Sequence, residues 1–134
     1  MFFSKITISI KKLRYKIYEW TGGKKMELLY RGSKDGMSGD AFHNKCNNKG
    51  PTISIIKNDK VYVFGGYSPT DWVICNDWIS APDSFIFTLI NMYEISPTKF
   101  TNSNTTYSIY DYCSYGPTFG GVMISVYVLI LTII

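Results

Sequence analysis

Two runs of β-branched and aromatic residues, separated by a tight turn, constrain the fold more than any other feature of this sequence. The runs occupy residues 52–56 and 61–64, and Asn58-Asp59 lies between them. Such side chains suit a half-buried pleated surface, and an Asn-Asp pair suits a tight turn. The sequence therefore predicts a β-hairpin, and Gly65-Gly66 directly after it predicts a bulge or a close approach of two backbones.

Three further segments have the pattern of strands. Residues 26–30 are mostly apolar and precede turn-forming residues 33–36, and residues 107–112 alternate between apolar and polar. Residues 84–90 alternate as well, but both of their faces are largely apolar, which predicts a strand between two packed layers. Its two faces carry Phe85, Phe87 and Leu89 on one side and Ile86, Thr88 and Ile90 on the other.

Two segments favour helices. Residues 6–20 combine apolar and basic side chains in a pattern that suits a helix or a strand, and we interpret it as an amphipathic helix that ends near Trp20, because Gly22-Gly23 follows. Residues 38–46 change to helical period, with Ser38 as a cap. Strands separated by turns, with few helices, predict a mainly β α+β domain: a two-sheet antiparallel β-sandwich flanked by short helices. The predicted core is Phe42, Ile53, Ile55, Phe64, Phe85, Phe87 and Leu89.

Size and composition indicate one folded domain. The chain has 134 residues, and domains typically run to roughly 100 to 150 residues. Hydrophobic residues make up 46% and aromatic residues 16% of the chain, which excludes a disordered protein. The net charge of +4 comes mainly from lysines and arginines in the first quarter. They lack the interleaved aromatics of a nucleic-acid surface, so a solvated face is expected and nucleic acid is not.

The cysteines and the N-terminus indicate a reducing compartment. Cys46, Cys75 and Cys113 are odd in number and widely spaced, which fits neither a disulfide framework nor a zinc site. We expect three buried free thiols. The first residues also lack the apolar core and the cleavage site of a secretory signal. The sequence therefore predicts a cytoplasmic protein.

No set of residues predicts an enzyme, a cofactor site or a metal site. His43 is the single histidine, and its spacing from Asp40 and Cys46 brings the three close together on a helix, but one helix cannot place an oxyanion hole between them. Asp35, Asp40 and Asp59 lack the ligand spacing of a calcium loop and suit turns and caps. Neither glycine pair is followed by the Lys-Ser or Lys-Thr of a phosphate-binding loop. We expect Trp20, Trp72 and Trp78 to lie in the core or at its rim.

An ordered set of segments resembles the TLDc (TBC/LysM-associated) domain family, which is found in oxidation-resistance proteins. The resemblance runs from about Trp20 to Gly121, so we assign residues 20–121 to the domain and residues 1–19 to a basic amphipathic segment. No single segment is specific to this family, but the ordered set of segments is. The segments are Leu28-Leu29-Tyr30-Arg31-Gly32-Ser33-Lys34-Asp35-Gly36, Ala41-Phe42-His43-Asn44-Lys45-Cys46, Asn48-Lys49-Gly50-Pro51-Thr52, Val63-Phe64-Gly65-Gly66-Tyr67 with Trp72, Asp83-Ser84-Phe85-Ile86-Phe87-Thr88-Leu89 and Tyr115-Gly116-Pro117-Thr118-Phe119-Gly120-Gly121.

The resemblance implies a non-catalytic protein-interaction module. It also implies a link to protection against oxidative stress and to the vacuolar proton-pumping ATPase, whose subunits several TLDc proteins bind. It supplies no binding motif that can be placed on particular residues here. The alternative function is a small membrane-attached protein held by its apolar C-terminus, with membrane contact through residues 117–134.

The apolar residues 122–134 do not resemble the family. Similar proteins continue after Phe-Gly-Gly with Gly-His-Asp, an aliphatic residue and then a run rich in Ser and Asn. Reading the codons of Val122-Met123-Ile124 one base earlier gives GAT, which encodes Asp, and the neighbouring shifted codons allow the rest of the pattern. We therefore hypothesise that a base was lost in the Gly120-Gly121 codons. The tail is then out of frame, and the domain is incomplete at its C-terminus, with unpaired sheet edges. Resequencing the gene and transcript across these codons tests this.

Overall fold

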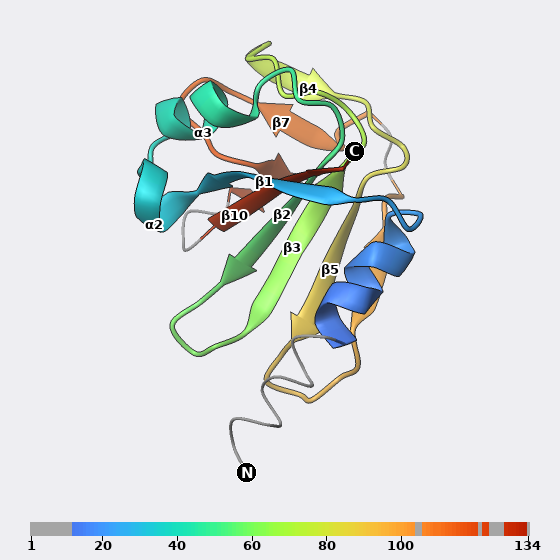
Figure 1. Ribbon diagram of the computed structural model, residues 1–134. Coiled ribbons are helices and arrows are strands. Elements are labelled where there is room, and N and C mark those ends of the chain that lie inside the picture. Colours follow the sequence, from blue (N-terminus) through green and yellow to red (C-terminus); the bar gives the residue numbers. More distant parts are fainter. Residues whose placement is uncertain (1–11, 104–105, 121, 124–127, 134) are drawn as a thin grey trace.

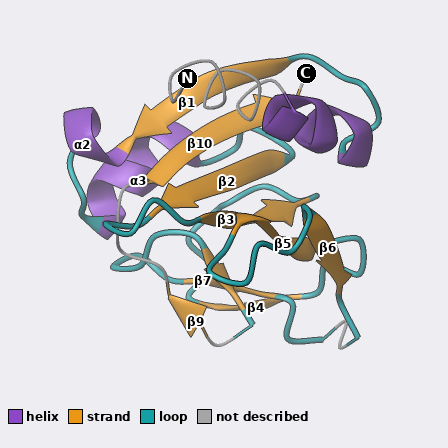
Figure 2. Cartoon of the chain, turned by 90° about the horizontal axis from the view of Figure 1, so that it is seen from below, coloured by secondary structure: helices purple, strands orange, loops and turns teal. Residues whose placement is uncertain are grey.

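Two antiparallel sheets form the frame of the molecule, as Figures 1 and 2 show. The computed structural model describes residues 12–103, 106–120, 122–123 and 128–133. A six-stranded sheet has the order β1-β10-β2-β3-β5-β6, and a four-stranded sheet has the order β4-β7-β8-β9. The strands are β1 (Met26–Arg31), β2 (Thr52–Lys57), β3 (Val63–Ser68), β4 (Asp77–Ile79), β5 (Phe85–Ile90), β6 (Thr98–Thr101), β7 (Ile109–Asp111), β8 (Thr118–Phe119), β9 (Val122–Met123) and β10 (Val128–Ile133).

Within the described ranges, three short helices flank the sheets, and the predicted mainly β sandwich is confirmed. Of the helix predicted over residues 6–20, residues 12–20 are helical and end at Trp20 as predicted, and residues 6–11 lie outside the described residues. The other two are α2 (Gly32–Asp35) and α3 (Gly39–Cys46). Ser38 caps α3 as predicted, because its hydroxyl accepts a hydrogen bond from the backbone N–H of Ala41 at 3.1 Å.

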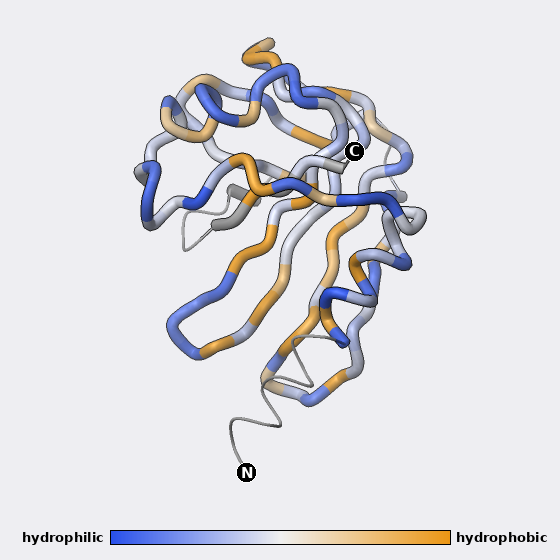
Figure 3. The backbone as a smooth tube through the Cα atoms, in the orientation of Figure 1, coloured by the Kyte–Doolittle hydropathy of each residue, from blue (hydrophilic) through white to orange (hydrophobic). Residues whose placement is uncertain are grey.

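The predicted hairpin is the pair β2 and β3, which are joined by the turn after Lys57. The strands pair from Thr52 opposite Ser68 to Lys57 opposite Val63, so β3 continues through the glycine pair. A side chain at Gly65 would collide with the carbonyl oxygen of Ser54, which confirms the predicted close approach. Figure 3 shows apolar stretches along the hairpin strands and β5, and a largely polar turn between β2 and β3.

The predicted core residues fall into two clusters on opposite faces of the six-stranded sheet. Residues of β2 alternate between them: Ile56 packs between the sheets, whereas Ile53 packs on the other face. The cluster between the sheets consists of Tyr30, Phe42, Cys46, Ile56, Trp72, Ala81, Ile109, Phe119 and Ile130, with Phe64 packed against it. The second consists of Ile17, Ile53, Phe85, Phe87 and Leu89, with Ile55 packed against it.

The helix of residues 12–20 covers the second cluster. Ile17 is buried there, and the ring of Trp20 lies 6.2 Å from Phe85 and 5.8 Å from Phe87, centroid to centroid. Figure 1 shows this helix beside β5. Part of the segment predicted to precede the domain therefore shields the apolar face of the sheet from water.

The prediction that β5 lies between two packed layers is wrong for one of its faces. Phe85, Phe87 and Leu89 are buried, but Ile86 is 49% and Ile90 is 38% exposed. The reason is that the four-stranded sheet packs over β2 and β3 of the six-stranded sheet and leaves the same face of β5 uncovered. The segment 107–112 also contributes a shorter strand than predicted, since β7 covers only Ile109–Asp111.

The described part of the apolar tail is paired in both sheets, where unpaired strand edges were expected: residues 122–123 form β9 of the four-stranded sheet, and the rest lies inside the six-stranded sheet. Residues 128–133 form β10, which pairs with β1 on one side and β2 on the other. Ile130 is fully buried, and the hydroxyl of Thr132 donates to the carbonyl of Lys49 at 2.8 Å. Among the described residues, no helix is long and apolar enough to cross a membrane. The out-of-frame origin of the tail stays a prediction.

Candidate functional site

The structure brings His43 together with Asp111 and not with the residues that sequence spacing placed beside it. Asp40, in the first turn of α3, is exposed. Cys46 is buried on the face of α3 that packs between the sheets, and this burial, with a smaller contribution from Asp35, raises the pKa of its thiol to about 12. Because only a thiolate is a strong nucleophile, Cys46 is held in its unreactive form at neutral pH.

His43 joins α3 to the end of β7. Its Nε2 donates to the backbone carbonyl of Tyr112 at 2.9 Å, and its Nδ1 lies 2.7 Å from the side-chain oxygen of Asn47. Because a carbonyl only accepts hydrogen bonds, Nε2 must carry a proton. The same nitrogen lies 3.8 Å from a carboxylate oxygen of Asp111, and both side chains are buried. The ring therefore links two elements that are 69 residues apart in the sequence.

Asp111 uses its carboxylate to hold a loop. Its Oδ2 accepts hydrogen bonds from the backbone N–H groups of Val73 at 2.7 Å and Ile74 at 2.9 Å. Its Oδ1 faces His43 and has no hydrogen-bond partner among the described residues. Burial of a charged group is costly unless it is paired, so this carboxylate depends on the histidine and on the two amides.

The loop that Asp111 holds exposes two apolar side chains, which we call the 73–74 tip. Val73 is 47% and Ile74 is 37% exposed, and Ile74 has a backbone φ of 56°. A β-branched residue rarely adopts this left-handed conformation, because its side chain clashes with the backbone. Strain of this kind persists where the surrounding structure enforces it, often at functional sites.

Trp72 anchors the tip from the other side. It is buried between the sheets, where its ring lies 5.3 Å from Phe42, and its Nε1 donates to the hydroxyl of Thr52 at 3.0 Å. The carbonyl of Trp72 also accepts a hydrogen bond from the N–H of Asn48 at 3.0 Å. The expectation that Trp72 lies in the core is confirmed, and Trp20 and Trp78 are half-buried at its rim. The tip is thus an exposed apolar pair on a rigid base.

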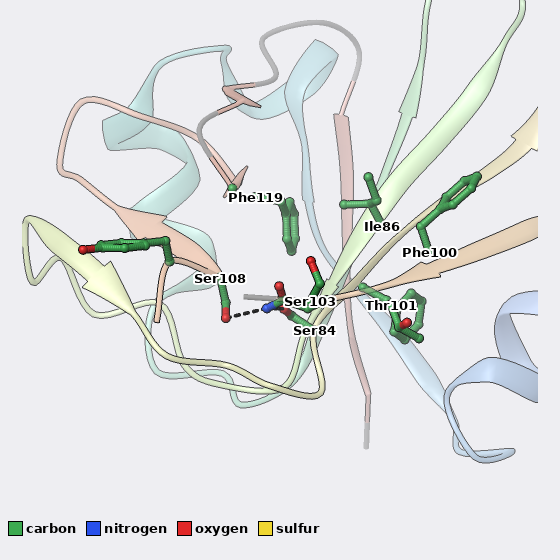
Figure 4. Close-up of a pocket in the computed structure, with 11 residues that line it drawn as sticks. Ser84, Ile86, Phe100, Thr101, Ser103, Ser108 and Phe119 are labelled. Atoms are coloured by element: carbon green, nitrogen blue, oxygen red, sulfur yellow. Dashed lines mark hydrogen bonds between the residues drawn. The ribbon is translucent and has the colours of Figure 1, made fainter. Parts of the chain in front are cut away.

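A hollow of about 210 Å³ opens at the uncovered face of β5 (Figure 4). Its apolar wall consists of Ile86 and Phe100, which pair across β5 and β6, together with the ring of Phe119. Asn102 also lines the hollow and donates to the hydroxyl of Ser108 at 2.6 Å. None of the residues that line it is an acidic, basic, histidine or cysteine residue, and its polar groups are hydroxyls and one side-chain amide.

The three cysteines differ in burial, which corrects the expectation that all three are buried. All are free thiols, but only Cys46 is buried, whereas Cys75 is exposed and Cys113 is half-buried. The reason is that Cys75 follows the exposed 73–74 tip and Cys113 follows the end of β7.

The aspartates that sequence spacing weighed as metal ligands lie in turns and caps. The carboxylate of Asp35 accepts a hydrogen bond from the backbone N–H of Arg31 at 2.9 Å at the end of β1. Among the described residues, no three His, Cys, Asp or Glu side chains are placed to bind one metal ion. The sequence analysis did not identify Asp111. The feature that could have indicated it is an acidic residue inside the alternating, strand-like segment 107–112.

Comparisons with known proteins place this β-sandwich, with its loop held by a buried carboxylate, in a family. The model of the TLDc domain matches residues 4–128, and the chain belongs to the TLDc domain family. Interferon-induced protein 44 of Homo sapiens is 36% identical over 47 residues, which is 35% of this chain and 10% of that protein. MTOR-associated protein MEAK7 of Danio rerio is 27% identical over 62 residues, which is 46% of this chain and 14% of that protein. The chain thus spans a small part of both relatives.

Proposed function

We propose that this chain is a non-catalytic protein-interaction module that binds its partner through the 73–74 tip. The supporting observation is that a fully buried carboxylate, Asp111, holds a strained loop whose two apolar side chains face solvent. Apolar side chains on a rigid base lose little conformational freedom on binding, which favours affinity. The module acts in the cytoplasm.

The geometry of His43 supports the proposal that the module is non-catalytic. Its ring is only 3% exposed, and both ring nitrogens are engaged by backbone or side-chain oxygens. A general base needs to reach the proton that it removes from a substrate, and a ring buried in this way cannot reach one. The nearby thiol of Cys46 is protonated, so it offers no nucleophile.

The family resemblance supports the subunits of the vacuolar proton-pumping ATPase as partner, and protection against oxidative stress as the wider role. One relative is named for its association with MTOR, which supports a partner among proteins and not among small molecules. The alternative of a membrane-attached protein has less support, because the described residues 128–133 of the tail are paired on both sides within a sheet.

Binding of the purified chain to the isolated peripheral sector of the proton pump tests this proposal. The double variant Val73→Asp and Ile74→Asp should weaken binding by about 30-fold or more, the effect of losing an interface hot spot. The control pair is Met92→Asp and Tyr93→Asp, because these side chains are also apolar and exposed but lie in the turn after β5. Equal binding by the tip variant, the control and the wild type would contradict the proposed surface.

A further inference from the structure

Two of the free cysteines lie on neighbouring segments at one end of the four-stranded sheet. Cys75 precedes β4 and Cys113 follows β7, and these strands pair antiparallel with Asp77 opposite Asp111. The pairing ends at this pair, because Asn76 bends the chain with a φ of 56°. Cys75 and Cys113 each lie two residues beyond this last pair, on the two segments that continue from it.

Contacts beyond the last paired residues hold the two segments together. The sulfur of Cys75 lies 3.9 Å from the carbonyl oxygen of Asp111, and only Tyr112 separates that residue from Cys113. The backbone N–H of Cys113 donates to the side-chain oxygen of Asn76 at 3.1 Å. Each cysteine therefore touches, directly or through its neighbour, the segment that carries the other.

Both thiols are accessible, unlike the third. Cys75 is exposed and Cys113 is half-buried, so a small oxidant in solution reaches them, whereas Cys46 is fully buried between the sheets. Thiol exchange requires access as well as proximity. Cys75 and Cys113 are therefore open to thiol exchange, whereas Cys46 is not.

We propose that Cys75 and Cys113 form an intrachain disulfide when the protein meets a low-molecular-weight disulfide such as oxidised glutathione. The thiolate of Cys75 attacks one glutathione sulfur, which forms a mixed disulfide and releases the first glutathione thiolate. The thiolate of Cys113 then attacks the sulfur of Cys75 and releases the second. Two protein thiols are oxidised, one glutathione disulfide is reduced to two thiols, and the protons of the cysteines end on the released glutathione.

The bond would fasten the exposed loop to β7 covalently. At present, hydrogen bonds from Val73, Ile74 and Cys113 hold the two segments together. The disulfide adds a link that does not depend on the protonation or hydration of these groups. The inference goes beyond the proposed function and does not depend on it.

Equilibration of the full chain in glutathione redox buffers at neutral pH tests the inference, with acid quenching, alkylation of remaining thiols and mass spectrometry. The expected product has lost two hydrogen atoms, yields a crosslinked peptide pair containing Cys75 and Cys113, and keeps the thiol of Cys46. The native chain should form it on the order of tenfold more readily than the chain in denaturant, because folding raises the effective concentration of the two thiols.

Single substitutions provide the matched controls. Cys46→Ser should leave the crosslink unchanged, whereas Cys75→Ser or Cys113→Ser should stop at a mixed disulfide that carries one glutathione. Three results would overturn the inference: glutathione on both cysteines without a crosslink, covalent dimers as the main product, or equal crosslinking of the native and denatured chains. The last comparison uses only the wild-type sequence, so it holds even if a variant folds poorly.

Discussion

Two turns of this molecule carry the same backbone strain and are held in opposite ways. Val61 in the β2–β3 turn has a φ of 63°, and Ile74 in the 73–74 tip has a φ of 56°. The first turn is held by its own residues, because the side-chain oxygen of Asn58 accepts hydrogen bonds from the N–H groups of Lys60 at 3.1 Å and Tyr62 at 2.9 Å. The second is held by Asp111, which lies 37 residues from Ile74 in the sequence.

This comparison shows that burial, and not the number of hydrogen bonds, decides how strongly each turn depends on the side chain that holds it. In each turn, two backbone N–H groups donate hydrogen bonds to one side-chain oxygen. Water can replace the lost bonds where the turn is exposed, as around Lys60, but it cannot reach the buried carboxylate of Asp111 without disrupting the core. The two turns should therefore respond very differently to loss of the residue that holds them.

The largest effect is expected for Asp111→Ala. This change leaves the N–H groups of Val73 and Ile74 unpaired and removes the charge that faces His43. Loss of one partner of a buried pair lowers the free energy of unfolding by about 3 to 5 kcal/mol. Urea denaturation measures it, with Asp83→Ala as the exposed control, for which about 0.5 kcal/mol or less is expected. A small effect at Asp111 would mean that water enters the site and that the two turns are alike.

The next effect is expected for His43→Ala. The variant loses the hydrogen bond to the carbonyl of Tyr112 and leaves Oδ1 of Asp111 without the imidazole that faces it. We expect the free energy of unfolding to fall by about 2 to 3 kcal/mol, the upper range for bonds that involve charged groups. Hydrogen exchange at the amides of Val73 and Ile74 should speed up in this variant and stay unchanged at Lys60. Unchanged exchange at all three amides would show that the histidine does not support the tip.

A smaller effect is expected for Asn58→Ala. The β2–β3 turn keeps its backbone bonds, in which Asn58 donates to the carbonyl of Tyr62 and accepts from the N–H of Val61, both at 3.1 Å. Only the two side-chain bonds are lost, so we expect a loss of about 1 kcal/mol. The midpoint of urea denaturation measures it beside Asp111→Ala. If Asn58→Ala lowered the free energy of unfolding as much as Asp111→Ala, the β2–β3 turn and the 73–74 tip would not differ in the way proposed.

The same contrast explains how much of the molecule could be predicted from its sequence. The β2–β3 turn was predicted because Asn58 acts on residues next to it, and the cap of α3 was predicted because Ser38 acts on Ala41. The role of Asp111 could not be predicted, because its partners lie on α3 and on the 73–74 tip, and no local pattern joins them. The open face of β5 was missed for a related reason, since periodicity gives a strand's apolar faces but not the extent of the layer above them.

The smallest effect, and one of opposite sign, is expected for Val61→Asn. Val61 is 58% exposed and contributes little packing, so its main effect is the strain of a β-branched residue at positive φ. Asparagine tolerates this conformation, and the substitution should raise the free energy of unfolding by about 0.5 to 1 kcal/mol. Ile74→Asn relieves the same strain, so it should stabilise the chain by a similar amount while it weakens partner binding, because it removes an exposed apolar side chain from the tip. Thermal denaturation and the binding measurement on the two variants separate these outcomes. Stabilisation at Val61 together with destabilisation at Ile74 would show that the isoleucine side chain packs as part of the fold, and the tip would then no longer be a surface reserved for a partner.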